Sequence, residues 1–144
     1  MITQQQIVAA ARRWRGTPYA HQASLKGTGT DCLGLVRGVW REVMGAEPEQ
    51  APAYSAGWAE AGTGEALAEA AARHLQYIPC TEFEAGDVLL FRWRPHLPAK
   101  HAGIASSKVT MIHAQEQAEV VEIALSPWWL RHLAFAFRFP GVTG

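Results

Sequence analysis

The sequence predicts an α+β fold in which N-terminal helices pack on an antiparallel sheet of about five strands. Two observations predict it. Apolar residues recur at helical spacing in the first half of the chain, and after Cys80 they form the short extended runs that are typical of strands. Helices first and strands afterwards indicate an antiparallel sheet, because a parallel sheet needs the two in alternation. The 144 residues suit one domain, which we expect to cover residues 1–144.

Three helices are expected in the first half of the chain, from Thr3 to about Arg15, from Asp31 to Gly45, and over Glu65–His74. Thr3 and Asp31 have side chains that cap helix N-termini, and Gly45 is a residue that ends helices. Residues 46–57 are rich in Pro and Ala and are expected to form a surface loop. The sequence assigns no role to this loop or to the longer segment 46–62 that contains it.

Five strands are expected in the second half, over Asp87–Phe91, His101–Ser106, Val109–Ala114, Val120–Leu125 and Leu133–Phe139. A loop with two prolines, Trp93–Lys100, separates the first two. The second and third are predicted to form a hairpin that turns near Ser107 and Lys108. Ser126 and Pro127 are expected to start a short helical turn, since Ser caps helices and Pro suits their first position.

Composition and charge exclude several classes of function. Thirteen basic residues balance thirteen acidic ones, so a nucleic-acid partner is not expected. The longest apolar runs are far too short to cross a bilayer, so membrane insertion is not expected either. The N-terminus lacks the basic start and the cleavage site of a signal peptide. We therefore expect the chain to be made in the cytoplasm and not to be exported alone by the general secretory route.

Cys32 is the residue whose position most favours chemistry. It follows an expected N-cap, where the free N–H groups and the positive end of the helix dipole favour a thiolate. Gly27, Gly29 and Gly34 would let a substrate backbone come close. The alternative is that Cys32 is a small buried hydrophobic residue, as most free cysteines are, and position alone leaves both interpretations open. Cys80 has no such context and is interpreted as structural.

A nucleophilic thiol needs a base, and the base needs an orienting partner. His101 and His113 stand at mirror-image positions about residue 107 of the predicted hairpin, so we predict that they form a directly opposed cross-strand pair. His96 lies in the proline-flanked loop, where it could contact substrate. Zinc binding by Cys32, His101 and His113 is the weaker alternative, because the closely spaced ligand pairs of zinc sites are missing. We therefore expect no metal and no cofactor.

Five short motifs follow one another along the chain: Trp14-Arg-Gly-Thr-Pro-Tyr19, Gly29-Thr-Asp-Cys-Leu-Gly-Leu-Val36, Ala85-Gly-Asp-Val-Leu-Leu-Phe91, His101-Ala-Gly-Ile104 and Ile112-His-Ala114. In this order they resemble the NlpC/p60 family of cysteine peptidases. The chain is most similar to short members that are encoded beside phage tail genes and in gene transfer agents. The resemblance implies a papain-like α+β core that hydrolyses amide bonds in peptidoglycan stem peptides, often between D-glutamate and a diamino acid.

The resemblance also implies roles for single residues. Cys32 matches the nucleophile, His101 the general base and His113 the polar residue that orients the base. Tyr19 matches the tyrosine whose hydroxyl helps to polarise the scissile carbonyl. Asp31 matches the acidic residue before the cysteine, in addition to its expected role as a helix cap.

Two departures from the family pattern alter the expected wall of the cleft. Leu33 stands where the family commonly has Ser, and Ala20-His-Gln-Ala23 replaces the usual aromatic-Gly-Gly. We therefore expect Leu33 and His21 to line the substrate cleft. Gln115 is the second candidate for orienting His101.

Together these expectations describe a cysteine peptidase that acts on peptidoglycan as a tail-tip component of a phage-like particle, with tail hub or baseplate proteins as partners. Such a particle would carry the enzyme to the cell wall from outside. Two alternatives stay open. One is a structural tail module of the same fold with little activity. The other is a thiol-dependent acyltransferase or amidase that acts on another substrate.

Trp128 and Trp129 are adjacent, so their side chains cannot point the same way. Either one of them is exposed for a partner or a glycan, or both pack around a short turn under the sheet. The sequence does not separate these two arrangements.

Overall fold

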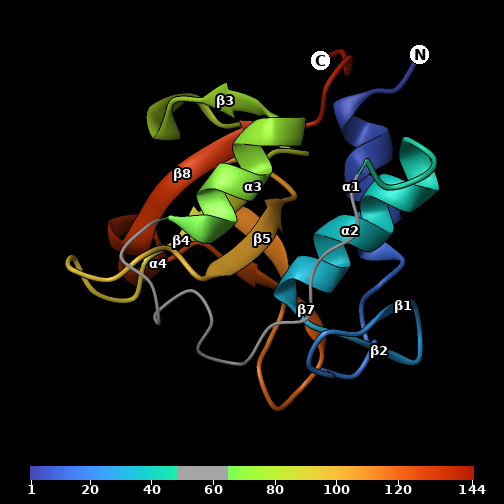
Figure 1. Cartoon of the computed structure of the whole chain (residues 1–144), viewed down its shortest axis with the longest axis horizontal. Helices are drawn as coiled ribbons and strands as arrows, with labels where there is room; N and C mark the ends of the chain where they lie inside the picture. Colours follow the sequence, from blue (N-terminus) through green and yellow to red (C-terminus); the bar gives the residue numbers. More distant parts are fainter. Residues whose placement is uncertain (49–64) are drawn as a thin grey trace.

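The computed structural model of the chain describes residues 1–48 and 65–144. Residues 49–57, most of the loop expected over residues 46–57, therefore lie outside the described residues. The predicted α+β class is confirmed: the described elements are four α-helices, one 3-10 helix and eight strands. Figure 1 shows α1, α2 and α3 gathered on one side of the main sheet.

The helices begin close to their expected starts. Their bounds are α1 Gln4–Arg12, α2 Cys32–Val43, α3 Ala66–His74, α4 Pro127–His132 and the 3-10 helix η1 Cys80–Glu82. Thr3 caps α1 in a capping box with Gln6, and Asp31 caps α2 through a bond from the Gly34 amide. Helix α1 ends three residues before the expected Arg15, because the chain turns at its C-cap, Arg13.

The main sheet has six strands in the order β3-β8-β4-β5-β6-β7, and every neighbouring pair is antiparallel. Its strands are β3 Gln76–Ile78, β4 Val88–Phe91, β5 His101–Ala105, β6 Thr110–Ala114, β7 Val120–Ala124 and β8 Leu133–Arg138. A separate ribbon pairs β1 Ser24–Leu25 with β2 Gly29–Thr30. The edge strand β3 is the addition to the expected five. It has only three residues and is mostly exposed, so it leaves no alternating apolar pattern in the sequence.

The two faces of the sheet bury separate apolar clusters. Helices α1, α2 and α3 pack on one face, where Ile7, Trp14, Leu35, Val39 and Leu67 meet the strands. The opposite face carries a smaller cluster around Leu89, Phe91, Met111 and Leu125, with Trp93 and Trp129 packed against it. The helices on the first face bring the N-terminus of α2 to the start of β5 (Figure 1).

A buried ion pair ties the N-terminal helix to the sheet. Asp87 is fully buried just before β4 and accepts two hydrogen bonds from the Arg138 guanidinium, at 2.8 and 2.9 Å. The same carboxylate accepts the side-chain amide of Gln4 and the backbone N–H of Glu84, each at 2.8 Å. One side chain thus links α1, the turn before β4 and β8.

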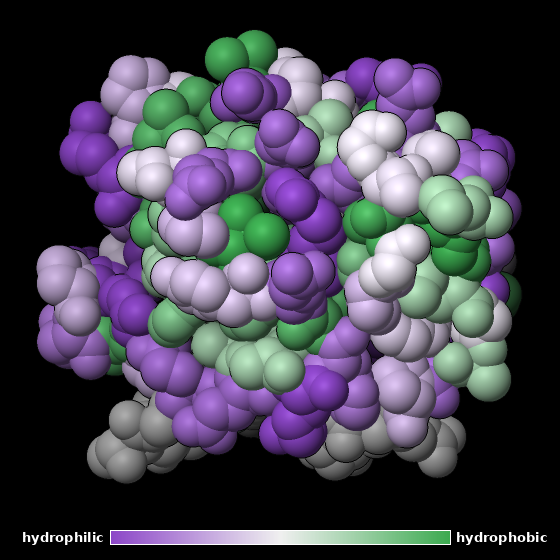
Figure 2. Space-filling model, turned by 90° about the horizontal axis from the view of Figure 1, so that it is seen from above, coloured by the Kyte–Doolittle hydropathy of each residue, from purple (hydrophilic) through white to green (hydrophobic). Residues whose placement is uncertain are grey.

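Hydrophilic residues are spread over the face of the molecule that carries both termini, with hydrophobic residues in small groups between them (Figure 2). In the described part of the chain, no helix is long and apolar enough to cross a membrane.

Replacing Gly38 with alanine is expected to destabilise the fold by about 1–3 kcal/mol. An added Cβ would lie 2.0 Å from Cζ2 of Trp14, whose ring is only 1 % exposed and is held by a bond from its Nε1 to Glu42. Alanine has a higher helix propensity than glycine by about 1 kcal/mol, so the expected loss is what remains after this gain offsets part of the clash with Trp14. Urea unfolding of the wild type and Gly38→Ala measures this loss, and a variant as stable as the wild type would contradict the expectation.

Candidate active site

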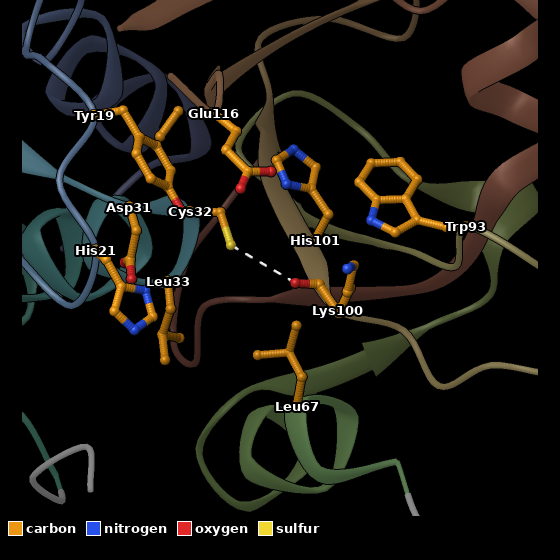
Figure 3. A pocket seen from close by; sticks show the side chains of 11 residues that line it. Tyr19, His21, Asp31, Cys32, Leu33, Leu67, Trp93, Lys100, His101 and Glu116 are labelled. Carbon is orange, nitrogen blue, oxygen red and sulfur yellow. Dashed lines mark hydrogen bonds between the residues drawn. The ribbon is translucent and has the colours of Figure 1, made fainter. Parts of the chain in front are cut away.

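One pocket brings together residues from both halves of the chain (Figure 3). Its lining comprises Tyr19, His21, Asp31, Cys32 and Leu33 from the N-terminal half, Leu67 from α3, and Trp93, Lys100, His101, Ala114 and Glu116 from the sheet and its loops. The pocket therefore lies where the first turn of α2 meets the N-terminal end of β5.

Asp31 fixes the backbone that carries Cys32. Its Oδ1 accepts the amide of Gly34 at 2.7 Å, and its Oδ2 accepts the amide of Gln22 at 2.8 Å. The residue is only 3 % exposed. It therefore holds the loop before α2 against the first turn of the helix and places Cys32 at the first helical position.

Gly34 does not open the site to a substrate backbone, as the sequence suggested. A Cβ on Gly34 would lie 2.0 Å from the carbonyl oxygen of Ala23, so the protein's own chain fills that space. A Cβ on Gly29 would meet the side chain of Ala20 at 2.9 Å, and Gly27 adopts a left-handed φ of +81°. None of the three glycines lines the pocket. Gly29 and Gly34 allow the chain to pack closely on itself, and Gly27 adopts the left-handed backbone conformation.

Burial at Cys32 opposes the thiolate that the N-terminus of α2 favours. Burial raises the pKa of Cys32 to about 12, and the negative charge of Asp31 adds to the effect. Backbone N–H groups, including those of Leu33 and Cys32 itself, lower the pKa, but by less than burial raises it. The thiol donates a weak hydrogen bond to the carbonyl oxygen of Lys100, with Sγ and O 3.8 Å apart (Figure 3).

His101 and His113 are hydrogen-bonded, but they are not the directly opposed pair that was predicted. Strands β5 and β6 pair Ile104 with Ile112, which places His113 opposite Gly103 instead of His101. The two histidines are therefore diagonal neighbours on one face of the sheet. Since Gly103 has no side chain, the rings meet across it, with Nε2 of His101 2.8 Å from Nδ1 of His113.

Both imidazoles are neutral at neutral pH. Burial is the main cause that lowers the pKa of His101 to about 3, with smaller effects from the charge of Lys100 and from the charge that His113 carries when it is protonated. Burial also lowers the pKa of His113 to about 4. When Nε2 of His101 donates to His113, Nδ1 of His101 keeps a lone pair and can accept a proton.

Aromatic rings account for much of this burial. The ring of Trp93 stacks on His101 with centroids 5.2 Å apart. Trp129 lies 5.8 Å from the His101 ring and makes an edge contact with His113 at 5.3 Å. Nε2 of His113 is buried and makes no hydrogen bond to the described part of the chain. The indoles thus keep water from the histidine pair, which penalises a charged ring.

Tyr19 extends its hydroxyl toward Cys32 in the pocket (Figure 3). Burial is the main cause that raises the pKa of Tyr19 to about 12, with smaller contributions from the neighbouring acidic groups of Cys32, Asp31 and Glu116. The hydroxyl therefore keeps its proton at neutral pH and can donate a hydrogen bond. The arrangement offers a thiol, a neutral base and a donor around one space, which suits nucleophilic attack on a carbonyl.

The structure places the other candidate residues differently. His21 and Leu33 line the pocket, whereas His96 and Gln115 are exposed and are not among the lining residues. The pocket also has lining residues that were not predicted from the sequence: Leu67, Trp93, Lys100 and Glu116. Trp93 and Lys100 are the first and last residues of the loop before His101, and Glu116 follows Gln115 in the sequence. Their closeness to candidate residues was the signal that could have identified them. Leu67 has no indication in the sequence, because only the packing of α3 brings it there.

Within residues 1–48 and 65–144, no three or more His, Cys, Asp or Glu side chains are grouped so as to hold a metal ion.

Lowering the pH from 7 to about 4.5 is expected to reduce the free energy of unfolding. The unfolded histidines take up protons below their ordinary pKa of 6.5, whereas folded His101 and His113 have pKa values lowered to about 3 and about 4. The unfolded state thus binds more protons between these values, so stability is lost as the pH falls through this window. Each histidine contributes up to about 1.4 kcal/mol per pH unit.

Urea unfolding at several pH values measures this dependence in the wild type and in His113→Gln, which lacks one titrating ring. The variant should show the shallower slope. Equal slopes would mean that the histidine pair does not titrate as described.

The chain is similar to known proteins of one family. The family model described as "NlpC/P60 family" matches residues 16–138. The NlpC/p60 domain of the peptidoglycan hydrolase SagA is 24 % identical with a TM-score of 0.66, and the match covers 96 % of this chain and 100 % of that one. An NLP/P60-family protein from Staphylococcus aureus, described as similar to lipoprotein, is 22 % identical with a TM-score of 0.64, covering 98 % and 42 %.

An NlpC/P60 family protein from Bacillus cereus is 18 % identical with a TM-score of 0.69, and the match covers 95 % of this chain and 40 % of that one. The chain thus spans less than half the length of the S. aureus and B. cereus proteins. At these identities the structural likeness shows the papain-like fold. No curated protein matches the sequence significantly.

Proposed function

Since the chain belongs to the NlpC/P60 family of cysteine peptidases and peptidoglycan hydrolases, we propose that it hydrolyses amide bonds in peptidoglycan stem peptides. One observation carries the proposal. Cys32, at the first position of α2, lines the same pocket as His101. Nε2 of His101 is hydrogen-bonded to Nδ1 of His113 at 2.8 Å. Nucleophile, base and orienting group are the parts that a cysteine peptidase requires.

The reaction begins with transfer of the Cys32 proton to Nδ1 of His101. In the resting site the thiol is bonded to the Lys100 carbonyl, so it first exchanges that bond for one to the imidazole. Sγ then attacks the amide carbon, and the new oxyanion accepts bonds from the Cys32 amide and the Tyr19 hydroxyl. His101 passes its proton to the leaving nitrogen, and the C–N bond breaks to leave a thioester.

Water completes the cycle. Neutral His101 removes a proton from a water molecule as the oxygen attacks the thioester, and the C–S bond breaks. The proton returns to Sγ, and the acid half of the peptide leaves. His113 holds the tautomer and tilt of His101 in both halves of the cycle. Before substrate binds, burial raises the pKa of the Cys32 thiol to about 12. The thiol therefore attacks only when His101 removes its proton as the S–C bond forms.

Replacing Tyr19 with phenylalanine is expected to lower kcat by about 10²–10³-fold, the cost of one oxyanion donor. The ring still fills the wall of the pocket, so KM should change little. Steady-state kinetics on a stem peptide separate the two constants. A kcat within threefold of the wild type would remove Tyr19 from the mechanism.

We further propose that the bond cleaved lies between D-glutamate and a diamino acid, and that the protein reaches the wall as a tail-tip component of a phage-like particle. Both proposals are supported by the resemblance of the five motifs to the short NlpC/p60 family members that are encoded with phage tail genes. In this proposal the chain is made in the cytoplasm and docks on tail hub or baseplate proteins. Probing purified particles with an antibody against the chain tests delivery, and particles without it would refute that part.

A digest of purified peptidoglycan, read by mass spectrometry, tests the activity and locates the bond. The wild type should release stem-peptide fragments that a Cys32→Ala sample does not, and the fragment masses identify the new termini. Intact peptidoglycan with a folded wild type would refute the peptidase and favour the structural module. Turnover of only non-peptide acyl substrates would favour the acyltransferase.

A further inference from the structure

A group of indole rings leads out of the pocket to the surface of α4. We call Trp93, Trp128 and Trp129 the tryptophan shelf. Trp128 lies 5.8 Å from Trp93 and 5.0 Å from Trp129, measured between ring centroids. His132, one helical turn after Trp128, stacks on its ring at 4.0 Å with 21° between the planes. The shelf is therefore a packed assembly whose outermost member has a fixed orientation.

The two adjacent indoles have separate positions. Trp129 turns inward against His101 and His113, at 5.8 and 5.3 Å. Trp128 stands at nearly a right angle to it, with 87° between the ring planes, and is 45 % exposed. Of the two arrangements that the sequence left open, the structure shows the one with an exposed ring.

The exposed ring is continuous with the candidate active site. Trp93 lines the pocket and stacks on His101 at 5.2 Å, and it also packs against Trp128 at 5.8 Å. Two ring contacts thus separate the imidazole from the surface indole. A group that rests on Trp128 is therefore held near the candidate active site.

The patch is small. Among the described residues, the other large hydrophobic side chain exposed on α4 is Leu130, at 47 %, and the remaining exposed ones lie on other elements. A stable protein interface buries about 800 Å² on each partner, with a wide apolar centre. A single indole with one leucine is too little for that, but one exposed indole is enough to contact one sugar ring.

We propose that the tryptophan shelf binds a sugar ring of the glycan strand, an N-acetylated amino sugar, on Trp128. This rests on the proposed function, because a stem peptide in the pocket is joined to such a sugar at its N-terminal end. One face of a pyranose presents C–H groups, which contact an aromatic ring, while the hydroxyls at its edge stay in water. The shelf thus gives the site a preference for stem peptides that are still attached to glycan.

The first experiment measures binding directly and does not need activity. The uncleaving Cys32→Ala protein is titrated with N,N′,N″-triacetylchitotriose while tryptophan fluorescence is followed. We expect saturable binding at millimolar concentration or below, weakened about tenfold by a second substitution, Trp128→Ala. Adding Tyr77→Ala instead is the matched control, since Tyr77 is an exposed aromatic residue, 62 % accessible, on the edge strand β3.

No saturable binding, or equal binding by the Trp128→Ala and Tyr77→Ala proteins, would overturn the sugar site. Circular dichroism of each variant verifies that the fold is kept. If Trp128→Ala fails to fold, Trp128→Phe keeps the packing but presents a smaller ring, and it should bind the trisaccharide more weakly than the Tyr77→Ala protein.

A second experiment compares two substrates, a free stem peptide and the same peptide on its disaccharide. Trp128→Ala should lose about tenfold more kcat/KM on the disaccharide-linked peptide than on the free one. Equal losses on the two would overturn the proposed preference. A wild type that binds the trisaccharide but cleaves neither substrate would refute the proposed function and still support the sugar site.

Discussion

Replacing Cys32 with alanine is expected to abolish peptidoglycan hydrolysis, with a loss of about 10⁴-fold or more. No other described side chain that lines the pocket can form the thioester, since the remaining polar groups are a phenol, carboxylates, imidazoles, an indole and an amine, none of which contains sulfur. The fold should be kept, because the hydrogen bond from the thiol to the Lys100 carbonyl is weak, with Sγ and O 3.8 Å apart. The rate of fragment release and the melting temperature measure the two effects.

Cys80→Ala is the matched control for this variant. Cys80 is the other free cysteine, lies in η1 and is not among the residues that line the pocket. Its replacement should leave the rate within twofold of the wild type. A Cys32→Ala protein that still cleaves stem peptides, or a Cys80→Ala protein that does not, would show that the wrong thiol has been assigned.

Replacing Asp87 with alanine is expected to lower the free energy of unfolding by about 3–5 kcal/mol. The substitution removes a fully buried carboxylate and leaves the Arg138 guanidinium without its bidentate partner. The side-chain amide of Gln4 and the backbone N–H of Glu84 lose their acceptor as well. This is a large part of the stability of a domain of this size. Urea unfolding at neutral pH measures it.

A surface ion pair provides the comparison. Glu122 on β7 pairs with Arg12 and Arg15, whose side chains are 47 % and 55 % exposed. Because exposed pairs are screened by water and salt, Glu122→Gln should cost less than about 1 kcal/mol. If the two variants were equally stable, the buried carboxylate would not be the link between α1 and the sheet that the contacts indicate.

Patterns that depend on neighbouring residues were predictable from the sequence. Thr3 and Asp31 cap helices because their side chains reach amides three residues along the chain, and those caps set where α1 and α2 begin. The apolar runs of β4 to β8 are strands because burial on a sheet favours such runs. Cys32 at the start of α2, and the order of helices and strands that defines the fold class, follow from these local effects.

The properties that give the candidate site its chemistry depend on contacts between distant segments. The register of β5 and β6 places Gly103 opposite His113, a shift of two residues that keeps both histidines on one face, because side chains alternate with a period of two. Helix-end amides alone favour a thiolate, but burial under the sheet outweighs them and keeps the Cys32 thiol protonated.

The neighbouring tryptophans show the same division. The sequence determined that Trp128 and Trp129 point in different directions, because adjacent residues of one backbone cannot project alike. Only the tertiary structure decided which ring turns inward, since that depends on the space that His101, His113 and Phe91 leave above the sheet. Local backbone chemistry thus determines which residues stand at the ends of helices and strands. Packing between segments decides their protonation, their partners and their exposure, because burial and distance are properties of the assembled fold.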